Sequence, residues 1–254
     1  MRTHDRRVPL EGAVNFRDLG GYPTTDNRSI RWRLLYRSDS LAELTDIDLK
    51  AVSDLGLRTL CDLRDTEERS AKPNRRPPSE LRVHDIGFTP YGAATLYSGV
   101  GCMTVQEIEG RVREVYRRFV TDHTQPFARL LDVLTQPGAL PAIMHCTSGR
   151  DRTGFAALVV LEALGVPRET IATDYMLSAE FRRDLKFQIG NDVAPAQVAA
   201  LTEPNPSYLD AAYEAIDETW GSVDAFLAEG LGLTGERRAH LQELLLEPDT
   251  TATK

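Results

Sequence analysis

The chain has 254 residues, of which 41% are hydrophobic and 27% are charged. These values are typical of a soluble globular protein, and the length suits one large α/β domain or two small ones. The formal net charge of −8 disfavours nonspecific binding to nucleic acid or to an anionic membrane surface. No apolar stretch approaches the length that spans a bilayer, and the charged residues 1–10 predict no signal peptide.

Three cysteines, Cys61, Cys102 and Cys146, are spread along the chain. They are too few and too scattered for a disulfide framework or a zinc site. We therefore expect free thiols, no metal and no cofactor. A reducing, cytoplasmic location fits this pattern.

The first half of the chain alternates segments typical of strands with segments typical of helices. Residues 1–12 are polar and predict a flexible terminus. Thr45 and Asp48 stand at the spacing of a capping box, which predicts the start of a helix. Short apolar runs indicate strands of a parallel sheet, and apolar residues three or four apart indicate amphipathic helices. The expected strands are 30–38, 57–63 and 81–86, and the expected helices are 45–56, 65–69, 104–123 and 126–134.

The second half is mostly helical. An apolar strand at 140–144 leads through a short loop into a buried helix at 155–164. Further helices are expected at 168–177, 207–227 and 234–246, and residues 247–254 predict a flexible tail. No linker forces a division, so we predict one α/β domain over residues 13–246.

The stretch 140–154 is the most informative part of the sequence. Strand, tight loop and helix N-terminus together form an anion site, because successive backbone N–H groups and the positive end of the helix dipole face one spot. Gly149 and Gly154 let the backbone approach an anion closely. Thr147 and Ser148 are expected to contribute N–H groups to the same spot. The pattern predicts a phosphate site.

Cys146 at the mouth of this loop distinguishes it from a nucleotide-binding loop. Backbone N–H groups and a helix N-terminus stabilise a thiolate, which would lie in line with the phosphorus of a bound phosphate. Arg152 follows at a spacing that closes a semicircular loop, and its planar fork suits two phosphate oxygens. The hydroxyl of Thr153 is placed to donate to the sulfur.

The Cys-x5-Arg-[Ser/Thr] pattern with a preceding His resembles the cysteine-dependent protein-tyrosine-phosphatase superfamily. Residues 145–154, His-Cys-Thr-Ser-Gly-Arg-Asp-Arg-Thr-Gly, are similar to a bacterial tyrosine/lipid phosphatase branch whose loop reads His-Cys-x-x-Gly-Lys-Asp-Arg-Thr-Gly. Asn-Phe-Arg-Asp-Leu-Gly-Gly-Tyr at 15–22 looks like the N-terminal motif of that branch. Tyr-Arg-Ser at 36–38 and Cys-Asp-Leu-Arg at 61–64 are similar to further family blocks. The family Lys is Arg150 here, and either residue would place a second positive charge at the pocket rim.

The resemblance implies a three-layer fold, with a mostly parallel sheet between helices and with extra helices after the loop, some of which act as a lid in relatives. It also implies a metal-independent phosphatase with a cysteinyl-phosphate intermediate. Cys146 is the expected nucleophile, and Asp151 is the first choice for the general acid. Asp62 is the runner-up, either as the acid or as a residue that orients Arg152. The phosphate-binding residues implied by the loop are Thr147, Ser148, Gly149, Arg150, Arg152, Thr153 and Gly154.

Three functions remain open from the sequence. The first is a phosphatase of phosphotyrosine proteins or phosphoinositides. The second is a small-molecule phosphatase acting on a sugar phosphate or a nucleotide, and the third is a phosphate-binding module without turnover. Residues 87–103 are either a flap over the site or an inert surface loop. Residues 178–206, where relatives carry the extra helices, are a second candidate lid.

Overall fold

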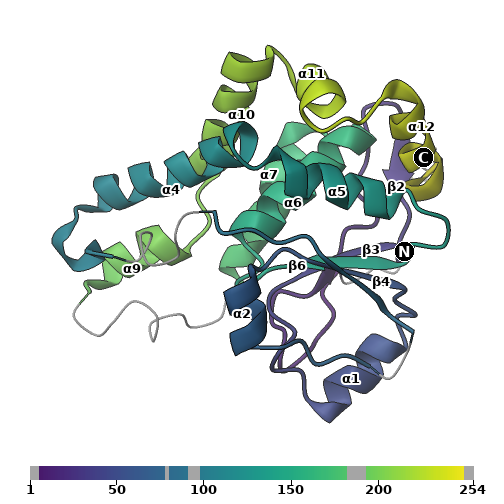
Figure 1. Cartoon of the computed structure of the whole chain (residues 1–254), viewed down its shortest axis with the longest axis horizontal. Helices are drawn as coiled ribbons and strands as arrows, with labels where there is room; N and C mark the ends of the chain where they lie inside the picture. Colours follow the sequence, from purple (N-terminus) through teal and green to yellow (C-terminus); the bar gives the residue numbers. More distant parts are fainter. Residues whose placement is uncertain (1–5, 78–79, 91–97, 182–192, 249–254) are drawn as a thin grey trace, which may run out of the picture.

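The structure is a computed structural model that describes residues 6–77, 80–90, 98–181 and 193–248. A central sheet has helices on both of its faces (Figure 1). Its strand order is β1-β3-β6-β4-β5, with β1 antiparallel to β3 and all other pairs parallel. The strands are β1 (Arg17–Asp18), β3 (Leu35–Ser38), β4 (Thr59–Asp62), β5 (Arg82–Asp85) and β6 (Ala142–His145). The predicted mostly parallel α/β sheet is confirmed.

The helices divide unequally between the two faces of the sheet. Two lie on one face, and the larger group lies on the other (Figure 1). The smaller group is α1 (Asp46–Ser53) and α2 (Thr66–Ala71). The larger group is α4 (Val105–Thr121), α5 (Thr124–Leu134), α6 (Asp151–Leu164), α7 (Arg168–Met176), α9 (Pro195–Thr202), α10 (Pro206–Trp220), α11 (Val223–Ala225) and α12 (Gly235–Leu245). Short turns η1 (Val100–Cys102), η2 (Leu177–Ala179) and η3 (Phe226–Gly230) complete the described helical segments.

Both faces of the central strands β3, β4 and β6 are buried, and β6 accordingly begins with three consecutive apolar residues. Tyr36, Leu60 and Ile143 stand in register and pack into the core on the α1 side. Met144, one residue further along β6, packs into the larger core on the opposite face. The period of two along a strand therefore separates two hydrophobic cores.

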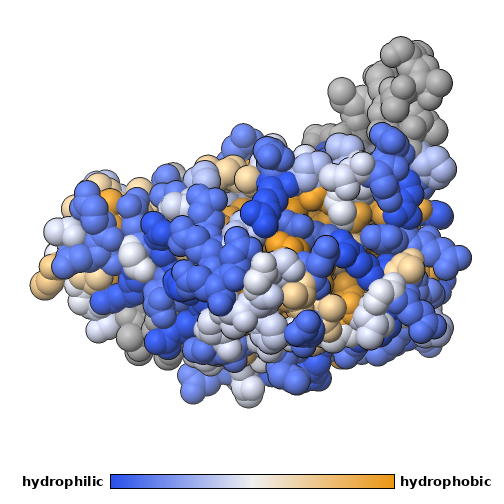
Figure 2. Space-filling view, turned by 90° about the horizontal axis from the view of Figure 1, so that it is seen from above, coloured by the Kyte–Doolittle hydropathy of each residue, from blue (hydrophilic) through white to orange (hydrophobic). Residues whose placement is uncertain are grey.

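The first core helix after β6 is α6, and its side chains are buried around most of its circumference. Phe155 in its first turns contacts an aromatic cluster, with ring centroids 4.7 Å from Phe127 and 5.3 Å from Phe119. Such contacts fix the start of α6 against α4 and α5. Figure 2 shows that hydrophilic residues predominate on the outer face seen from above, with hydrophobic residues visible mainly in a central region.

Two expected elements are interrupted in the structure. The predicted strand 30–38 is divided into β2 (Arg28–Ile30) and β3, because the chain turns at Arg33, whose φ is 64°. The predicted helix 207–227 ends earlier, since Gly221 adopts a left-handed φ of 78°. Both breaks come from local backbone conformations that an apolar pattern does not reveal.

Parts of both terminal segments contact the rest of the chain. Within 1–12, Arg7 forms a bridge with Arg17, and Leu10 is buried. At the other end, β7 (Leu246–Pro248) pairs with β2 in a small antiparallel sheet. Residues 6–12 and 247–248, for which the sequence predicts flexibility, thus contact the folded chain, and the remaining terminal residues lie outside the described ranges.

Two segments proposed as covers of the site are described only in part. Residues 91–97 of the proposed flap lie outside the described residues, and its remainder contains η1. Residues 182–192 of the second segment are also outside, and its remainder contains α9.

The aromatic cluster generates a prediction about stability. Phe127→Ala removes a fully buried ring and is expected to lower the free energy of unfolding by roughly 3–5 kcal/mol, measured by urea denaturation. Ile47→Ala is the control, because Ile47 is 73% exposed, and its expected change lies within about 0.5 kcal/mol. If both variants change the free energy of unfolding equally, the aromatic cluster does not contribute specifically to stability.

Candidate active site

The loop 146–152 connects the end of β6 to the start of α6, as the sequence predicts. Cys146 is 1% exposed at its beginning. Gly149 has a φ of 69°, and a Cβ there would lie 2.7 Å from backbone atoms of Ser38 and Asp39. Glycine is therefore required at this position, both because φ is positive and because the backbone at the end of β3 lies too close for a side chain.

Four successive carbonyl groups of the loop face residues outside it, and those of residues 147–149 accept hydrogen bonds there. The carbonyl oxygens of residues 146–149 lie, in order, 3.2 Å from His145 Nδ1, 3.1 Å from Ser40 N, 3.2 Å from Asn15 Nδ2 and 2.7 Å from Arg37 Nη2. In a trans peptide the N–H group points opposite to the carbonyl of the same unit. The N–H groups of residues 147–150 are consequently directed to the inside of the loop, where an anion would bind.

The carboxylate of Asp174 on α7 joins the N-terminal motif to this loop. It accepts hydrogen bonds from Arg17 Nε at 3.0 Å, from Arg37 Nη1 at 2.6 Å and from the Tyr22 hydroxyl at 3.0 Å. Burial alone would raise the pKa of Asp174, but the two arginine charges hold it below its ordinary value. Because Arg37 also binds the Gly149 carbonyl, the ion cluster fixes the loop backbone.

The two charged residues of the N-terminal motif have different partners. Arg17 is directed to Asp174, whereas Asp18 accepts hydrogen bonds from the N–H groups of Gly20 at 2.7 Å and Arg33 at 2.8 Å. Arg17 therefore belongs to the support of the loop, and Asp18 braces a turn.

The fork of Arg152 is bound by Glu68 on α2. Arg152 Nη1 lies 2.5 Å from Glu68 Oε2, and Nη2 lies 2.7 Å from Oε1. Glu68 also accepts a hydrogen bond from the Thr147 hydroxyl at 2.5 Å. These bonds fix the guanidinium, which interacts electrostatically with Cys146. The sequence pattern does not identify Glu68 as a residue of the site. Its visible signal was the spacing to Asp65, which the structure shows as a reciprocal capping box.

Asp151 occupies the first turn of α6, where its carboxylate has three donors. Arg150 Nε and Nη2 each lie 2.8 Å from one of its oxygens, and the Tyr116 hydroxyl donates to it at 3.0 Å. Tyr116 is in turn 2.8 Å from the Tyr175 hydroxyl. Burial, with the nearby charge of Asp151, raises the pKa of Tyr116, so this hydroxyl keeps its proton.

Asp62 does not contact Arg152 through any hydrogen bond described. Its carboxylate instead accepts from Arg64 Nη2 at 2.7 Å and from Asn74 Nδ2 at 2.8 Å, and lies 3.4 Å from His145 Nε2. Burial favours a higher pKa for Asp62, but His145 and Arg64 together hold it well below the ordinary value. The prediction that Asp62 orients Arg152 is therefore corrected, since Glu68 has that contact.

The remaining predicted residues also lie at the loop. Arg150 is only 6% exposed, and its guanidinium faces Asp151 and carbonyls near the end of α9 rather than an open rim. Thr153 Oγ1 is buried and makes no hydrogen bond within the described part of the chain. Gly154 lies against the ring of Tyr175, with 3.0 Å between the ring and a Cβ built there.

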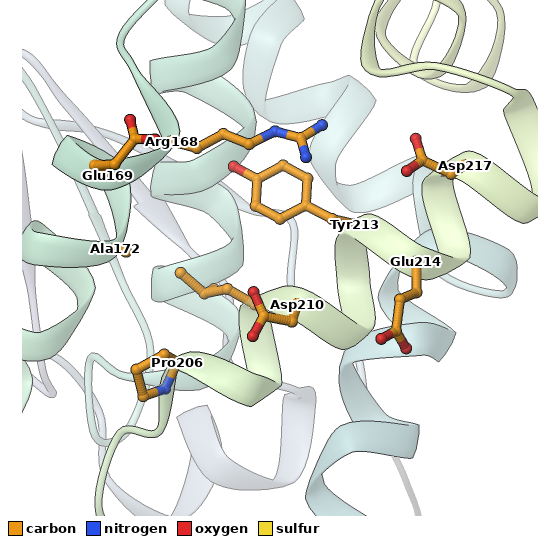
Figure 3. A pocket seen from close by; sticks show the side chains of 9 residues that line it. Arg168, Glu169, Ala172, Pro206, Asp210, Tyr213, Glu214 and Asp217 are labelled. Carbon is orange, nitrogen blue, oxygen red and sulfur yellow. The ribbon is translucent and has the colours of Figure 1, made fainter.

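A separate concavity of about 410 Å³ lies between α7 and α10 (Figure 3). Arg168 of α7 stacks on the ring of Tyr213, with 4.0 Å from the guanidinium carbon to the ring centroid. Acidic side chains, including Glu169 and Asp210, line its rim. No residue of the loop 146–152 lines this concavity, which is distinct from the candidate active site.

Comparison with known proteins agrees with this geometry. A family model described as "Tyrosine phosphatase family" matches residues 8–247. The chain is 35% identical over 241 residues to a putative tyrosine-protein phosphatase of Cupriavidus necator, covering 90% of this chain and 84% of that protein. This chain belongs to the tyrosine phosphatase family, and the resemblance predicted from the sequence is confirmed.

Two more distant similarities complete the comparison. The chain is 29% identical over 259 residues to the triple specificity protein phosphatase PtpB of Mycobacterium tuberculosis, covering 87% of this chain and 92% of that protein. The solved core catalytic domain of the PP-IP phosphatase SIW14 from S. cerevisiae is 14% identical, covering 82% of this chain and 94% of that chain with a TM-score of 0.37. That score supports no inference. No helix in the described ranges has the length and apolar character needed to cross a membrane.

The Glu68–Arg152 pair predicts a pH dependence of stability. Burial opposes the charge of Glu68, but the bonds from Arg152 lower its pKa from 4.5 to about 2. Because the folded-state pKa lies below the unfolded one, this contribution is present above about pH 5 and is lost as the pH falls. The stability difference between wild type and Glu68→Gln should shrink by roughly 2 kcal/mol from about pH 6 to about pH 3.

The measurement is urea denaturation of both proteins at each pH. Glu67→Gln is the matched control, because Glu67 is the exposed neighbour on the same helix. If the difference in the free energy of unfolding between wild type and Glu68→Gln does not change with pH, the ion pair does not stabilise the folded protein.

Proposed function

We propose that the protein is a cysteine-dependent phosphomonoesterase that hydrolyses phosphotyrosine in proteins and, as a further substrate class, phosphoinositides. The outward direction of the four loop carbonyls carries this proposal, because it turns the matching N–H groups toward one anion site beside Cys146. The family membership supports the same reaction class.

In the first step the Cys146 thiolate attacks the phosphorus. The sulfur–phosphorus bond forms and the bond from phosphorus to the leaving oxygen breaks. The loop N–H groups and Arg152 bind the remaining phosphate oxygens and stabilise the charge that develops on them. Glu68 holds Arg152 through Nη1 and Nη2, and Nη1 also donates to the Leu63 carbonyl at 3.2 Å. The Nε–H group and the second N–H of Nη2 are proposed to bind the phosphate. Asp151 donates a proton to the leaving oxygen.

In the second step water hydrolyses the cysteinyl-phosphate. Asp151, now a carboxylate, accepts a proton from the water as its oxygen bonds to phosphorus. The sulfur leaves as a thiolate, and the buried hydroxyl of Thr153 is available to donate a hydrogen bond to it. The loop N–H groups and Arg152 offset the phosphate charge throughout, so the proposed reaction requires no metal.

We assign Asp62 a positioning role rather than that of the acid. Its lowered pKa and its bonds to Arg64 and Asn74 support a permanent carboxylate, which cannot donate a proton. It is placed to orient His145, whose other ring nitrogen lies next to the Cys146 carbonyl.

The environment of Arg150 favours substrates with one phosphate group. Its guanidinium is bound to Asp151 and to backbone carbonyls, so it does not form a free second cation site at the rim. Aryl phosphates are therefore proposed as better substrates than inositides with several phosphates. The same observation favours a small sugar phosphate or nucleotide monophosphate as the second candidate class. The proposed reaction needs a reduced thiol, which is consistent with a cytoplasmic location.

The nucleophile is tested with p-nitrophenyl phosphate in the presence of EDTA. Cys146→Ser should lower turnover by on the order of a thousandfold or more, because a hydroxyl replaces the thiolate. Cys102→Ser is the matched control, since Cys102 is exposed and distant in sequence from the loop, and it should keep wild-type turnover. Turnover that survives in Cys146→Ser would refute the mechanism, and loss of wild-type turnover with EDTA would refute its metal independence.

The acid is tested by changing the leaving group. Asp151→Asn should lower the rate with phenyl phosphate about a hundredfold, and the rate with p-nitrophenyl phosphate much less, because nitrophenolate leaves without protonation. Asp62→Asn should reduce stability and lower both rates by the same factor. A leaving-group effect in Asp62→Asn and none in Asp151→Asn would reverse the assignment.

A further inference from the structure

Arg150 lies between the proposed acid and a helix that follows much later in the chain. Its guanidinium makes hydrogen bonds in two directions. Two of them bind Asp151, as described above. On the other side, Nη2 donates to the carbonyl of Leu201 at 2.8 Å and Nη1 donates to that of Glu203 at 3.3 Å. One buried side chain thus connects the loop 146–152 to the C-terminal end of α9.

The last carbonyls of α9 need partners from outside the helix. A cation at this end is favoured, because the helix dipole is negative there. Arg150 supplies that cation, and the Tyr208 hydroxyl binds the neighbouring carbonyl of Ala200 at 2.7 Å. A helix of this length is not stable alone, so its position depends on such contacts and on packing.

The opposite end of α9 has an anchor of its own. Gln197 in the first turn donates from Nε2 to the carbonyl of Met103 at 2.6 Å and to that of Val100 at 3.1 Å. These carbonyls precede α4, and α9 runs below α4 in Figure 1. The helix is therefore fixed by Gln197 at one end and by Arg150 at the other.

We infer that Arg150 is a positioning residue that couples the orientation of Asp151 to the seating of α9. The inference rests on the proposed role of Asp151 as proton donor. A protonated carboxyl accepts fewer hydrogen bonds than a carboxylate, so Arg150 must give up part of its contact with Asp151 before the first step. The α9 carbonyls hold the guanidinium in place at that stage.

If α9 is displaced, the Arg150 guanidinium loses the carbonyls of Leu201 and Glu203, and it no longer holds Asp151 in one orientation. Attack by the thiolate depends on the loop N–H groups and continues. Protonation of the leaving oxygen becomes slow. Displacement of α9 is therefore expected to lower the rate mainly for substrates whose leaving groups are basic and need protonation.

The chain offers two substitutions that loosen α9 in different ways. Arg150→Lys keeps the positive charge but replaces a planar fork by one ammonium group, which cannot reach Asp151 and both carbonyls together. Gln197→Ala removes the anchor at the far end without altering the loop. Gln242→Ala is the matched control, because its amide donates to the Ala163 carbonyl from α12, away from α9.

The experiment measures two quantities in each variant. The first is the ratio of kcat/KM for p-nitrophenyl phosphate to that for phenyl phosphate, and the second is amide hydrogen exchange over residues 195–203. In Arg150→Lys and Gln197→Ala we expect the ratio to rise about tenfold and the exchange to accelerate about tenfold. Gln242→Ala should change neither.

Each other outcome has a distinct meaning. Faster exchange of α9 with an unchanged ratio overturns the coupling. Unchanged exchange in Arg150→Lys shows that Arg150 does not hold α9, and Gln197→Ala gives an independent test should Arg150→Lys fail to fold. If Asp151→Asn itself leaves the ratio unchanged, the assignment of the acid fails, whereas the exchange results still decide whether Arg150 holds α9.

Discussion

The buried carboxylate of Asp174 is the interaction on which the site depends most. Two arginines from β1 and β3 converge on it without access to water, and neither cation could stay buried without it. Through Arg37 the same cluster reaches the carbonyl of Gly149. An ion cluster within the protein thus sets the direction of peptide groups that would bind an ion from solution.

The loop itself is short, but its shape is imposed by segments from distant parts of the sequence. Asn15 precedes β1, Ser40 follows β3, and Glu68 lies on α2, on the other side of the sheet from α6. A free peptide of the loop sequence would have its carbonyls bound to water. The fold replaces this water with fixed donors, so the N–H groups need little reorganisation when an anion binds.

Local signals in the sequence predicted much of the fold and only part of the site. Capping spacing and apolar periodicity located most helices and strands, because these features act over a few residues. The pairing of β2 with β7 depends on contacts across the chain, and the left-handed backbone at Arg33 leaves no mark in an apolar pattern, so the sequence predicts neither. The same distinction between local and distant contacts explains which site residues the sequence predicts. Loop residues such as Cys146 are contiguous, whereas Asp174 lies inside an ordinary helical pattern, 157 residues from Arg17.

The small sheet of β2 and β7 has a consequence for how the chain reaches this structure. Its two strands are far apart in the sequence, so during synthesis β2 is hydrogen-bonded to the preceding residues 21–24 but lacks its neighbour β7 until residues 246–248 leave the ribosome. The elements that shape the loop 146–152, up to α7, emerge earlier. The nascent chain can therefore assemble its anion site before β2 pairs with β7.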